Sequence, residues 1–342
     1  MDESRPPKHA RLSVVESGRK EGAGLQIGGI SQPPDHNLRI KHANLFVRSL
    51  LIFGYARHMS FKIYRSADSL FIESTDSPGQ FRHVSNGDFS FDELFSSNDP
   101  KAYVARIFES ASEGESIDPG IPFQAPIGNQ EIWAAGVTYF RSRTARMEEA
   151  ESAGGDVFYD KVYDAERPEL FFKCSPAKAR GHMDVVCIRE DSTWDVPEPE
   201  LTLAISSSGK VFGYTVGNDM SSRSIEGENP LYLPQAKVYK GSCSIGPCLV
   251  VCDPLPPETR ISVTITRDDE EAFGGETEIS QIKRSLDELA GFLFRSNEFP
   301  QGAYLMTGTG VVPDSDFTLE EGDIVSIRIE GIGILTNAVE KV

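Results

Sequence analysis

The chain has 342 residues, 39% of them hydrophobic, with 52 acidic against 34 basic side chains and a net charge of −18. This apolar content is enough for a sizeable core and argues against disorder of the whole chain. A charge of this sign repels phosphate backbones and anionic lipid, and no apolar run reaches about 18 residues, so we expect neither nucleic acid nor a membrane as partner.

Residues 1–58 differ from the rest of the chain. They hold nine Lys and Arg against five Asp and Glu, and the first 40 residues show no sustained helical or strand period. Three interpretations compete: a solvated tail, an organellar presequence, or a segment upstream of a start at Met59. The acidic residues argue against a transit peptide, so we expect a disordered leader over 1–58.

The pattern becomes regular after this leader. Residues 60–66 and 69–74 alternate apolar and polar side chains, which predicts the two arms of a β-hairpin. Residues 91–110 have the apolar spacing of a helix. The stretch GIPFQAPIG at 120–128 is interrupted by Pro and Gly, so we predict a small N-terminal domain over 59–124 and a catalytic domain over 125–342.

The predicted catalytic domain is rich in strands. Turns are expected at Ser208-Gly209, Gly274-Gly275 and Glu321-Gly322, and two segments have the period of a helix, 143–153 and 280–294. This pattern favours an α+β fold dominated by strands over an alternating βαβ array. The predicted strands cover residues 131–137, 170–173, 201–206, 211–216, 248–251, 260–266, 303–307 and 323–329.

Several kinds of site lack support in the sequence. There is no phosphate-binding loop of the form GxxxxGK[ST] and no complete GxGxxG, so nucleotide binding is not indicated. Only His83 and His182 follow Met59, too few for a histidine-ligated zinc site or a Ser-His-Asp triad. The five cysteines include no CxxC pair, which suits a reducing compartment, and we expect a cytoplasmic protein.

The stretch from 194 to 247 carries the main chemical signal. Glu198 and Glu200 are two residues apart, so on an extended backbone both carboxylates face one side, roughly 7 Å apart at the backbone. Pro199 has no N–H to donate, so a strand should begin there or lie at a sheet edge. A following hairpin would return Asp219 to the glutamates. Three carboxylates without histidine suit Mg²⁺, Mn²⁺ or Ca²⁺ better than zinc.

A family resemblance rests on a long series of motifs. The runs VPEPEL, GYTVGNDMSSR, KVYKGSCSIGP, LMTGTG, EEGDIV and GIGILTNAV occur in this order between 196 and 339. Together they resemble the fumarylacetoacetate hydrolase superfamily, whose fold is a mixed β-sandwich roll. The runs WAAGVTYFRSR, ERPELFFK and GENPLYLPQAK look most like the branch that dehydrates 2-keto-3-deoxy sugar acids such as 2-keto-3-deoxy-D-arabinonate.

The resemblance implies a set of site residues. Glu198, Glu200 and Asp219 match the family's metal ligands, and Lys237 matches its active-site lysine. We expect Mg²⁺ as the metal, with Mn²⁺ or Ca²⁺ as alternatives. Lys237 and Glu169 are the candidate catalytic residues, with the base left open between them. Candidate substrate-binding residues are Tyr139, Arg141, Arg143, Arg223 and Thr309.

The implied reaction is loss of water from a small 2-keto acid. A 2-keto acid can chelate a cation, which stabilises the charge that develops when C3 loses a proton, and the C4 hydroxyl then leaves. Hydrolytic relatives commonly have a His three residues after the Tyr of the first catalytic strand, where this chain has Ser142. This departure favours a dehydratase over the alternative, a hydrolase that cleaves a C–C bond in an acylpyruvate or a 2,4-diketo-3-deoxy sugar acid.

Two further expectations concern the surroundings of the site. Relatives are commonly homodimers or larger, so we expect a homo-oligomer. Glu226, Glu228 and Asn229 are expected to shape a loop over the mouth of the site, or else to form a solvated loop.

Overall fold

The computed structural model describes residues 59–114, 117, 121–142 and 161–342. They belong to one compact unit, Leu50–Val342. The predicted leader over 1–58 and the predicted helix over 143–153 lie outside the described residues. Among the described residues, no helix has both the length and the apolar character that a bilayer crossing requires.

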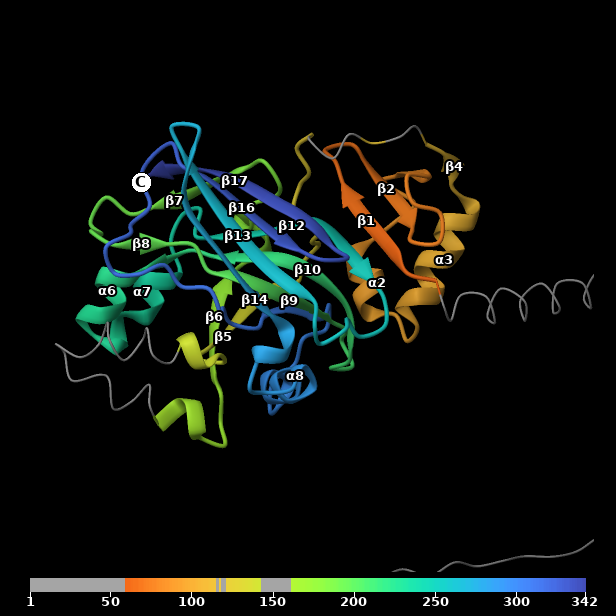
Figure 1. The fold of residues 1–342 in the computed structure, drawn as a ribbon. Coiled ribbons are helices and arrows are strands. Elements are labelled where there is room, and N and C mark those ends of the chain that lie inside the picture. Colours follow the sequence, from red (N-terminus) through yellow and green to blue (C-terminus); the bar gives the residue numbers. More distant parts are fainter. Residues whose placement is uncertain (1–58, 115–116, 118–120, 143–160) are drawn as a thin grey trace, which may run out of the picture. The chain divides into compact units, whose positions relative to one another are not determined.

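A ten-stranded sheet forms the centre of the unit (Figure 1). Its strands pair antiparallel except for β15 and β5, so the sheet is mixed. In spatial order the strands are β4 (Ser112–Glu113), β3 (Phe81–Ser85), β2 (Ser69–Ser74), β1 (Phe61–Arg65), β12 (Cys243–Val251), β10 (Val211–Asp219), β9 (Pro199–Ile205), β15 (Ala303–Met306), β5 (Glu131–Gly136) and β6 (Glu169–Cys174).

A five-stranded sheet packs on part of the large sheet, with contacts of β13, β16 and β17 to β9, β10 and β12. In spatial order its strands are β14 (Glu270–Glu278), β13 (Arg260–Arg267), β16 (Ile324–Ile329), β17 (Gly333–Lys341) and β7 (Val185–Ile188). A further pair joins β8 (Asp195–Val196) to β11 (Ser221–Ser222).

The helices are short and lie around the sheets (Figure 1). The α-helices that lie wholly within the described residues include α2 (Phe91–Ser96), α3 (Pro100–Ser110), α6 (Arg223–Glu228), α7 (Leu233–Lys237) and α8 (Leu286–Phe294). The 3₁₀ helices are η2 (Pro176–Lys178), η3 (Pro230–Tyr232) and η4 (Ile279–Gln281).

The central strands of the large sheet, β12, β10 and β9, are buried on both faces. Every residue of β9 is buried, and its alternate side chains enter different cores. Leu201 and Leu203 lie in the core between the two sheets, whereas Ala204 lies in the core that contains α2 and α3. A strand covered on both faces reads as a continuous apolar run rather than as a simple alternation. Glu198 and Glu200, at the start of β9, are therefore buried as well.

The N-terminal hairpin is confirmed, because β1 and β2 pair as predicted. The helix predicted over 91–110 is instead two helices, α2 and α3. Asp99 accepts a hydrogen bond from the N–H of Ala102, and Pro100 occupies the first turn of α3. Both residue types favour the start of a helix, which explains the break.

The two predictions in the region of β14 and α8 need correction. The turn predicted at Gly274-Gly275 is wrong: β14 passes through both glycines, and the chain turns instead at Asp268 and Asp269, which have φ of 51° and 65°. The helix predicted over 280–294 begins only at Leu286, where the Ser285 side chain accepts from the N–H of Glu288. Asp tolerates the left-handed region better than most residues, which suits a turn at 268–269.

The N-terminal strands continue the sheet of the catalytic region. β1 pairs with β12 in an antiparallel register that joins Phe61 to Val251 and Tyr64 to Cys248. α2 and α3 share an apolar core with residues of β5, β9 and β15. The division at residue 124 therefore stays a prediction.

A candidate metal and catalytic site

The β9–β10 hairpin brings the three predicted metal ligands together. β9 begins at Pro199, as expected, although it lies inside the sheet rather than at an edge. The antiparallel register sets Glu200 opposite Gly217, and the N–H of Asp219 donates to the carbonyl of Glu198 at 3.0 Å. Asp219 therefore ends its strand directly opposite Glu198.

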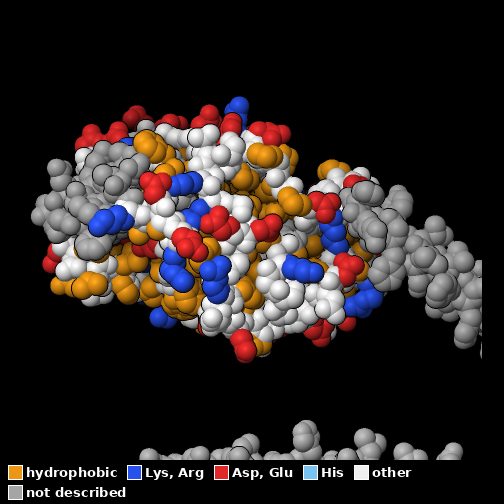
Figure 2. Space-filling model, turned by 90° about the horizontal axis from the view of Figure 1, so that it is seen from below, with side chains coloured by type: hydrophobic (Ala, Val, Ile, Leu, Met, Phe, Trp, Pro, Cys, Tyr) orange, Lys and Arg blue, Asp and Glu red, His pale blue; other side chains and the backbone are white. Residues whose placement is uncertain are grey.

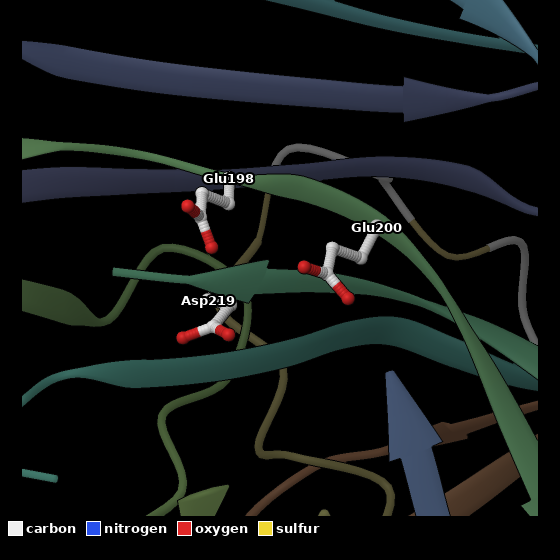
Figure 3. Close-up of side chains that lie close together, drawn as sticks. All are labelled: Glu198, Glu200 and Asp219. Carbon is white, nitrogen blue, oxygen red and sulfur yellow. The ribbon is translucent and has the colours of Figure 1, made fainter. Parts of the chain in front are cut away.

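The three carboxylates face one shared space (Figure 3). One oxygen from each of Glu198, Glu200 and Asp219 lies within 4.8 Å of the others, and each residue is at most 4% exposed. Burial raises the pKa of Glu200 well above its usual range, and the charges of Asp219 and Glu198 raise it further. A divalent cation among these oxygens would offset that repulsion, so the donor set fits a hard cation such as Mg²⁺.

Three buried cations contact two of the carboxylates. Lys237 pairs with Glu198 and places its Nζ 3.5 Å from Oδ2 of Asp219. Arg223 donates from Nη2 to Oε1 of Glu198 at 2.6 Å. Lys173 pairs with Oδ1 of Asp219. Buried carboxylates need such partners, because an unpaired charge in the interior is costly.

Glu200 is stabilised differently from the other two carboxylates. Its Oε2 accepts a hydrogen bond from the backbone N–H of Gly308 at 2.6 Å. Gly308 has φ of 90°, and a Cβ there would lie 2.0 Å from Oγ1 of Thr138. Only glycine fits this position without strain, and its conformation aims the amide at the carboxylate.

A small pocket opens in front of the carboxylates. Residues of three segments form its walls: Ala135, Gly136 and Val137 at the end of β5, Phe171 on β6, and Gly308 with Thr309 after β15. Lys237 and Ser142 complete it. Ser142 uses its hydroxyl on the backbone of Tyr139, accepting from its N–H at 3.1 Å and donating to its carbonyl at 2.8 Å.

The sequence and fold can now be compared with known proteins. Residues 133–340 match the family described as fumarylacetoacetate (FAA) hydrolase C-terminal. The chain belongs to the fumarylacetoacetate hydrolase family. The strand-rich mixed fold expected from the sequence is thereby confirmed, and it recurs in a solved structure of 2-keto-3-deoxy-D-arabinonate dehydratase in its apo form, with a TM-score of 0.69 and 32% identity over 83% of this chain and 99% of that one.

Two curated relatives and a second solved structure share the same activity class by name. A probable 2-keto-3-deoxyxylonate dehydratase of Haloferax volcanii is 52% identical over 64% of this chain and 74% of its own length. A 2-dehydro-3-deoxy-D-arabinonate dehydratase of Saccharolobus solfataricus is 42% identical over 63% and 74%. The second solved structure, 2-keto-3-deoxy-D-arabinonate dehydratase complexed with magnesium and 2,5-dioxopentanoate, has a TM-score of 0.68. It is 32% identical over 83% of this chain and 99% of that one.

Among the predicted substrate contacts, the structure brings Tyr139, Arg223 and Thr309 into or beside the cluster. Tyr139 is 1% exposed, and its hydroxyl has no hydrogen-bond partner among the described residues. Burial and the nearby charge of Glu200 raise the pKa of Tyr139. Thr309 lines the pocket, but its hydroxyl bonds to the backbone of Val311. The substrate roles of these residues stay predictions.

The structure separates the other two predicted substrate contacts from the cluster. The side chain of Arg141 is 40% exposed and pairs with Asp314 at 2.9 Å, and Arg141 is not among the residues that line the pocket. Arg143 lies outside the described residues. Their roles also stay predictions.

Glu169 lies on the strand beside the pocket wall. β6 pairs with β5 so that Glu169 is opposite Gly136. A Cβ at Gly136 would lie only 2.0 Å from Oε2 of Glu169, so the carboxylate occupies the space that the glycine leaves free. This places Glu169 next to a residue that lines the pocket, and its predicted catalytic role stays open.

Sequence reasoning missed Lys173 and the two short helices that carry cations of the site. Arg223 begins α6 and Lys237 ends α7. The expected loop over 226–229 is mostly helix α6, in which Glu226 is 1% exposed and accepts from the Ser221 hydroxyl at 3.0 Å. A signal for Lys173 was present, because a lysine inside the apolar strand ELFFKC is unusual without a buried partner.

Proposed function

We propose that the protein is a metal-dependent dehydratase that converts a 2-keto-3-deoxy pentonate, such as 2-keto-3-deoxy-D-arabinonate or -xylonate, to 2,5-dioxopentanoate. Its enzyme class is a hydro-lyase, and its partner is a small 2-keto acid. One observation carries the proposal: three buried carboxylates and Lys237 converge on one pocket, in a chain that is 52% identical to a probable 2-keto-3-deoxyxylonate dehydratase. Glu198, Glu200 and Asp219 would hold the cation, with Mg²⁺ favoured over Mn²⁺ and Ca²⁺.

The residues of the chain divide the chemistry between them. A bound divalent cation supplies a Lewis acid that polarises the keto group. Lys237, which faces the pocket, would take the proton from C3 as the neutral amine, and Glu169 in its protonated form would deliver a proton to the leaving C4 hydroxyl. The hydrogen from C3 and the hydroxyl from C4 leave as water, and the unsaturated product tautomerises to the dioxo acid. The apolar walls of Ala135, Val137 and Phe171 limit access of bulk water.

Hydrolysis of a C–C bond is the less favoured reaction. It needs an activated water, and no histidine among the described residues lines the pocket. Ser142, at the position where hydrolytic relatives commonly have histidine, has its hydroxyl committed to the backbone of Tyr139. Product masses separate the two reactions, because dehydration removes one water from an intact carbon chain whereas hydrolysis splits that chain.

Metal removal tests the proposal directly. Purified protein treated with EDTA and desalted is expected to lose turnover of 2-keto-3-deoxy pentonates and to recover it with Mg²⁺ or Mn²⁺. The readout is formation of 2,5-dioxopentanoate by mass spectrometry, with hexonates as the comparison substrates. Undiminished turnover after metal removal would reject the metal-dependent mechanism.

We further propose that the enzyme is a cytoplasmic homo-oligomer. The free cysteines among the described residues and the lack of a CxxC pair support a reducing compartment. The exposed side chains of Met183 and Ile334 support self-association, because large exposed apolar groups are common at subunit contacts. Light scattering measures the mass of the purified protein in solution, and a mass of a single chain would contradict the homo-oligomer.

A further inference from the structure

Lys173 is a fully buried lysine whose ammonium contacts only protein groups in the structure. Its Nζ donates to the carbonyl of Met220 at 2.9 Å and to the carbonyl of Lys237 at 2.5 Å, and it pairs with Oδ1 of Asp219. An ammonium has three N–H donors and no acceptor. Two of the three N–H groups are therefore donated to backbone carbonyls, and the ammonium also forms an ion pair with the Asp219 carboxylate.

Lys237 is arranged differently, although it is equally buried. It pairs with Glu198, lies 3.5 Å from Oδ2 of Asp219, and sits 5.7 Å from the ring centroid of Phe171, which lines the pocket. Lys237 lines the pocket itself, and Lys173 does not. The two lysines thus approach opposite oxygens of the Asp219 carboxylate, and only one of them faces the reacting space.

We propose that Lys173 is a positioning residue that fixes Asp219 and Lys237 relative to each other. Its contacts join the end of β10, at Asp219 and Met220, to the last residue of α7, at Lys237. Its ion pair with Oδ1 fixes the orientation in which Asp219 presents its carboxylate to a cation. This inference rests on the proposed divalent-cation site.

Loss of Lys173 is expected to weaken the binding of a divalent cation. Groups that hold a metal ligand in place typically contribute 10- to 100-fold to metal affinity or activity. Without Lys173, the Asp219 carboxylate keeps only its 3.5 Å contact with Lys237 as an ion pair, and α7 loses a contact at its final carbonyl. We therefore expect the affinity for a divalent cation to fall by roughly that factor.

The experiment measures Mn²⁺ binding to the full chain without substrate, by the electron paramagnetic resonance signal of free Mn²⁺. Lys173→Met is expected to raise the Kd for Mn²⁺ by roughly 10- to 100-fold. Lys178→Met, at an exposed lysine five residues along the chain, is the matched control and should bind as wild type does. Absence of binding by wild type would refute the proposed function, whereas equal binding by wild type and Lys173→Met would refute this inference alone.

A double-mutant cycle separates positioning of Asp219 from a general structural role. If Lys173 acts through Asp219, adding Lys173→Met to Asp219→Asn should change the already weakened Kd by less than about twofold. Independent, multiplying losses would overturn the proposal. Should Lys173→Met fail to fold, the double variant should fold again, because the buried carboxylate that lost one of its ion-pair partners is gone. A double variant that stays unfolded would also overturn it.

Discussion

At the scale of single residues, the three carboxylates of the site are not equivalent. Glu198 and Asp219 each contact side-chain cations, whereas Glu200 accepts a hydrogen bond from a backbone amide. An amide carries only a partial charge, so it compensates a buried carboxylate less completely than an ammonium does. Glu200 is accordingly the ligand whose pKa burial raises well above its usual range, and the one that gains most from a bound cation.

This difference predicts opposite effects of two matched substitutions on the metal-free protein. Glu200→Gln removes a poorly compensated charge. It should increase the free energy of unfolding of the metal-free protein by about 1–3 kcal/mol and so raise its unfolding temperature. Glu198→Gln leaves Lys237 and Arg223 without their partner and should lower it.

Thermal unfolding with and without Mg²⁺ checks both effects. Added Mg²⁺ should stabilise wild type and leave Glu200→Gln nearly unchanged, because a ligand that binds only the native state shifts the unfolding transition. If both variants shifted the unfolding temperature of the metal-free protein in the same direction, the proposed difference between Glu198 and Glu200 would be wrong.

Asp195 predicts a pH dependence of stability. It is 3% exposed, and burial raises its pKa to about 6, partly opposed by a hydrogen bond from Ser192 and by the charges of Lys341 and Arg189. Because the folded-state pKa exceeds the unfolded one, the folded state favours the protonated form. Its stabilising contribution is complete below about pH 4 and is lost as the pH rises through 6.

The substitution Asp195→Asn tests this linkage. It should stabilise the protein by about 1–3 kcal/mol at pH 8 and have little effect near pH 4, since each pKa unit corresponds to about 1.4 kcal/mol. Urea unfolding at the two pH values measures the difference. A stabilisation that is the same at both pH values would contradict a raised pKa.

At the scale of elements, paired strands place the carboxylates of the candidate site, and short helices place two of its cations. β9 and β10 bring the carboxylates together, and β5 and β6 set Glu169 beside the pocket wall at Gly136. The short helices α6 and α7 carry Arg223 and Lys237. Helices of five or six residues are not stable alone in water, so their conformation depends on the packing around them.

The contact between Gly136 and Glu169 predicts the effect of adding one methyl group at position 136. Gly136→Ala should displace the flexible Glu169 carboxylate and lower turnover by roughly 100-fold or more, the usual contribution of a general acid. The fold should persist, because the atom that clashes is the end of a side chain. Steady-state kinetics and circular dichroism provide the two measurements.

A second glycine in the chain serves as its control. A Cβ at Gly291, in α8, would meet nothing within 4 Å. Gly291→Ala should therefore keep full activity and stabilise the protein by about 0.5–1 kcal/mol, as expected for alanine in a helix. If Gly136→Ala turned over substrate at the wild-type rate, Glu169 would not be the acid.

The elements show where sequence patterns were informative. Strands such as β1, β2, β13 and β16 were predicted to within a residue or two, because alternation and turn residues are local signals. The break between α2 and α3 follows from a capping aspartate and a proline, which the apolar period alone did not indicate. The glycine pair in β14 misled the prediction, since Gly275 avoids a close contact with Val311 rather than forming a turn.

At the scale of the whole molecule, the net charge of −18 does not produce a single acidic surface on every side. Figure 2 shows acidic and basic side chains intermixed on the visible face, with hydrophobic groups between them. The buried site carries its own compensation, with three side-chain cations for three carboxylates. The charges of the site thus sum to about zero, and a bound divalent cation would supply the local positive charge that an anionic substrate needs.

The predicted leader is testable at this scale. A chain that begins at Met59 is expected to keep the turnover number, the metal requirement and the oligomeric mass of the full chain. The reason is that, among the residues that the structure describes, the sheets, the two large apolar cores and the candidate site are built from Met59 onward. A loss of more than about tenfold in turnover would show that residues 1–58 contribute to the catalytic unit.

The sequence by itself indicated the fold class and the three candidate metal ligands. Glu198, Glu200 and Asp219 were singled out by their spacing along a strand, by a single hairpin and by the family resemblance of the motifs around them, and these are short-range features of the chain. What only the tertiary structure decided is the environment of those ligands. Lys173 reaches Asp219 from a strand 46 residues earlier, the Gly308 amide reaches Glu200 from more than a hundred residues later, and Arg141 pairs with Asp314 instead of entering the pocket. Such contacts depend on how distant strands pair and which faces become buried, and no local pattern records that.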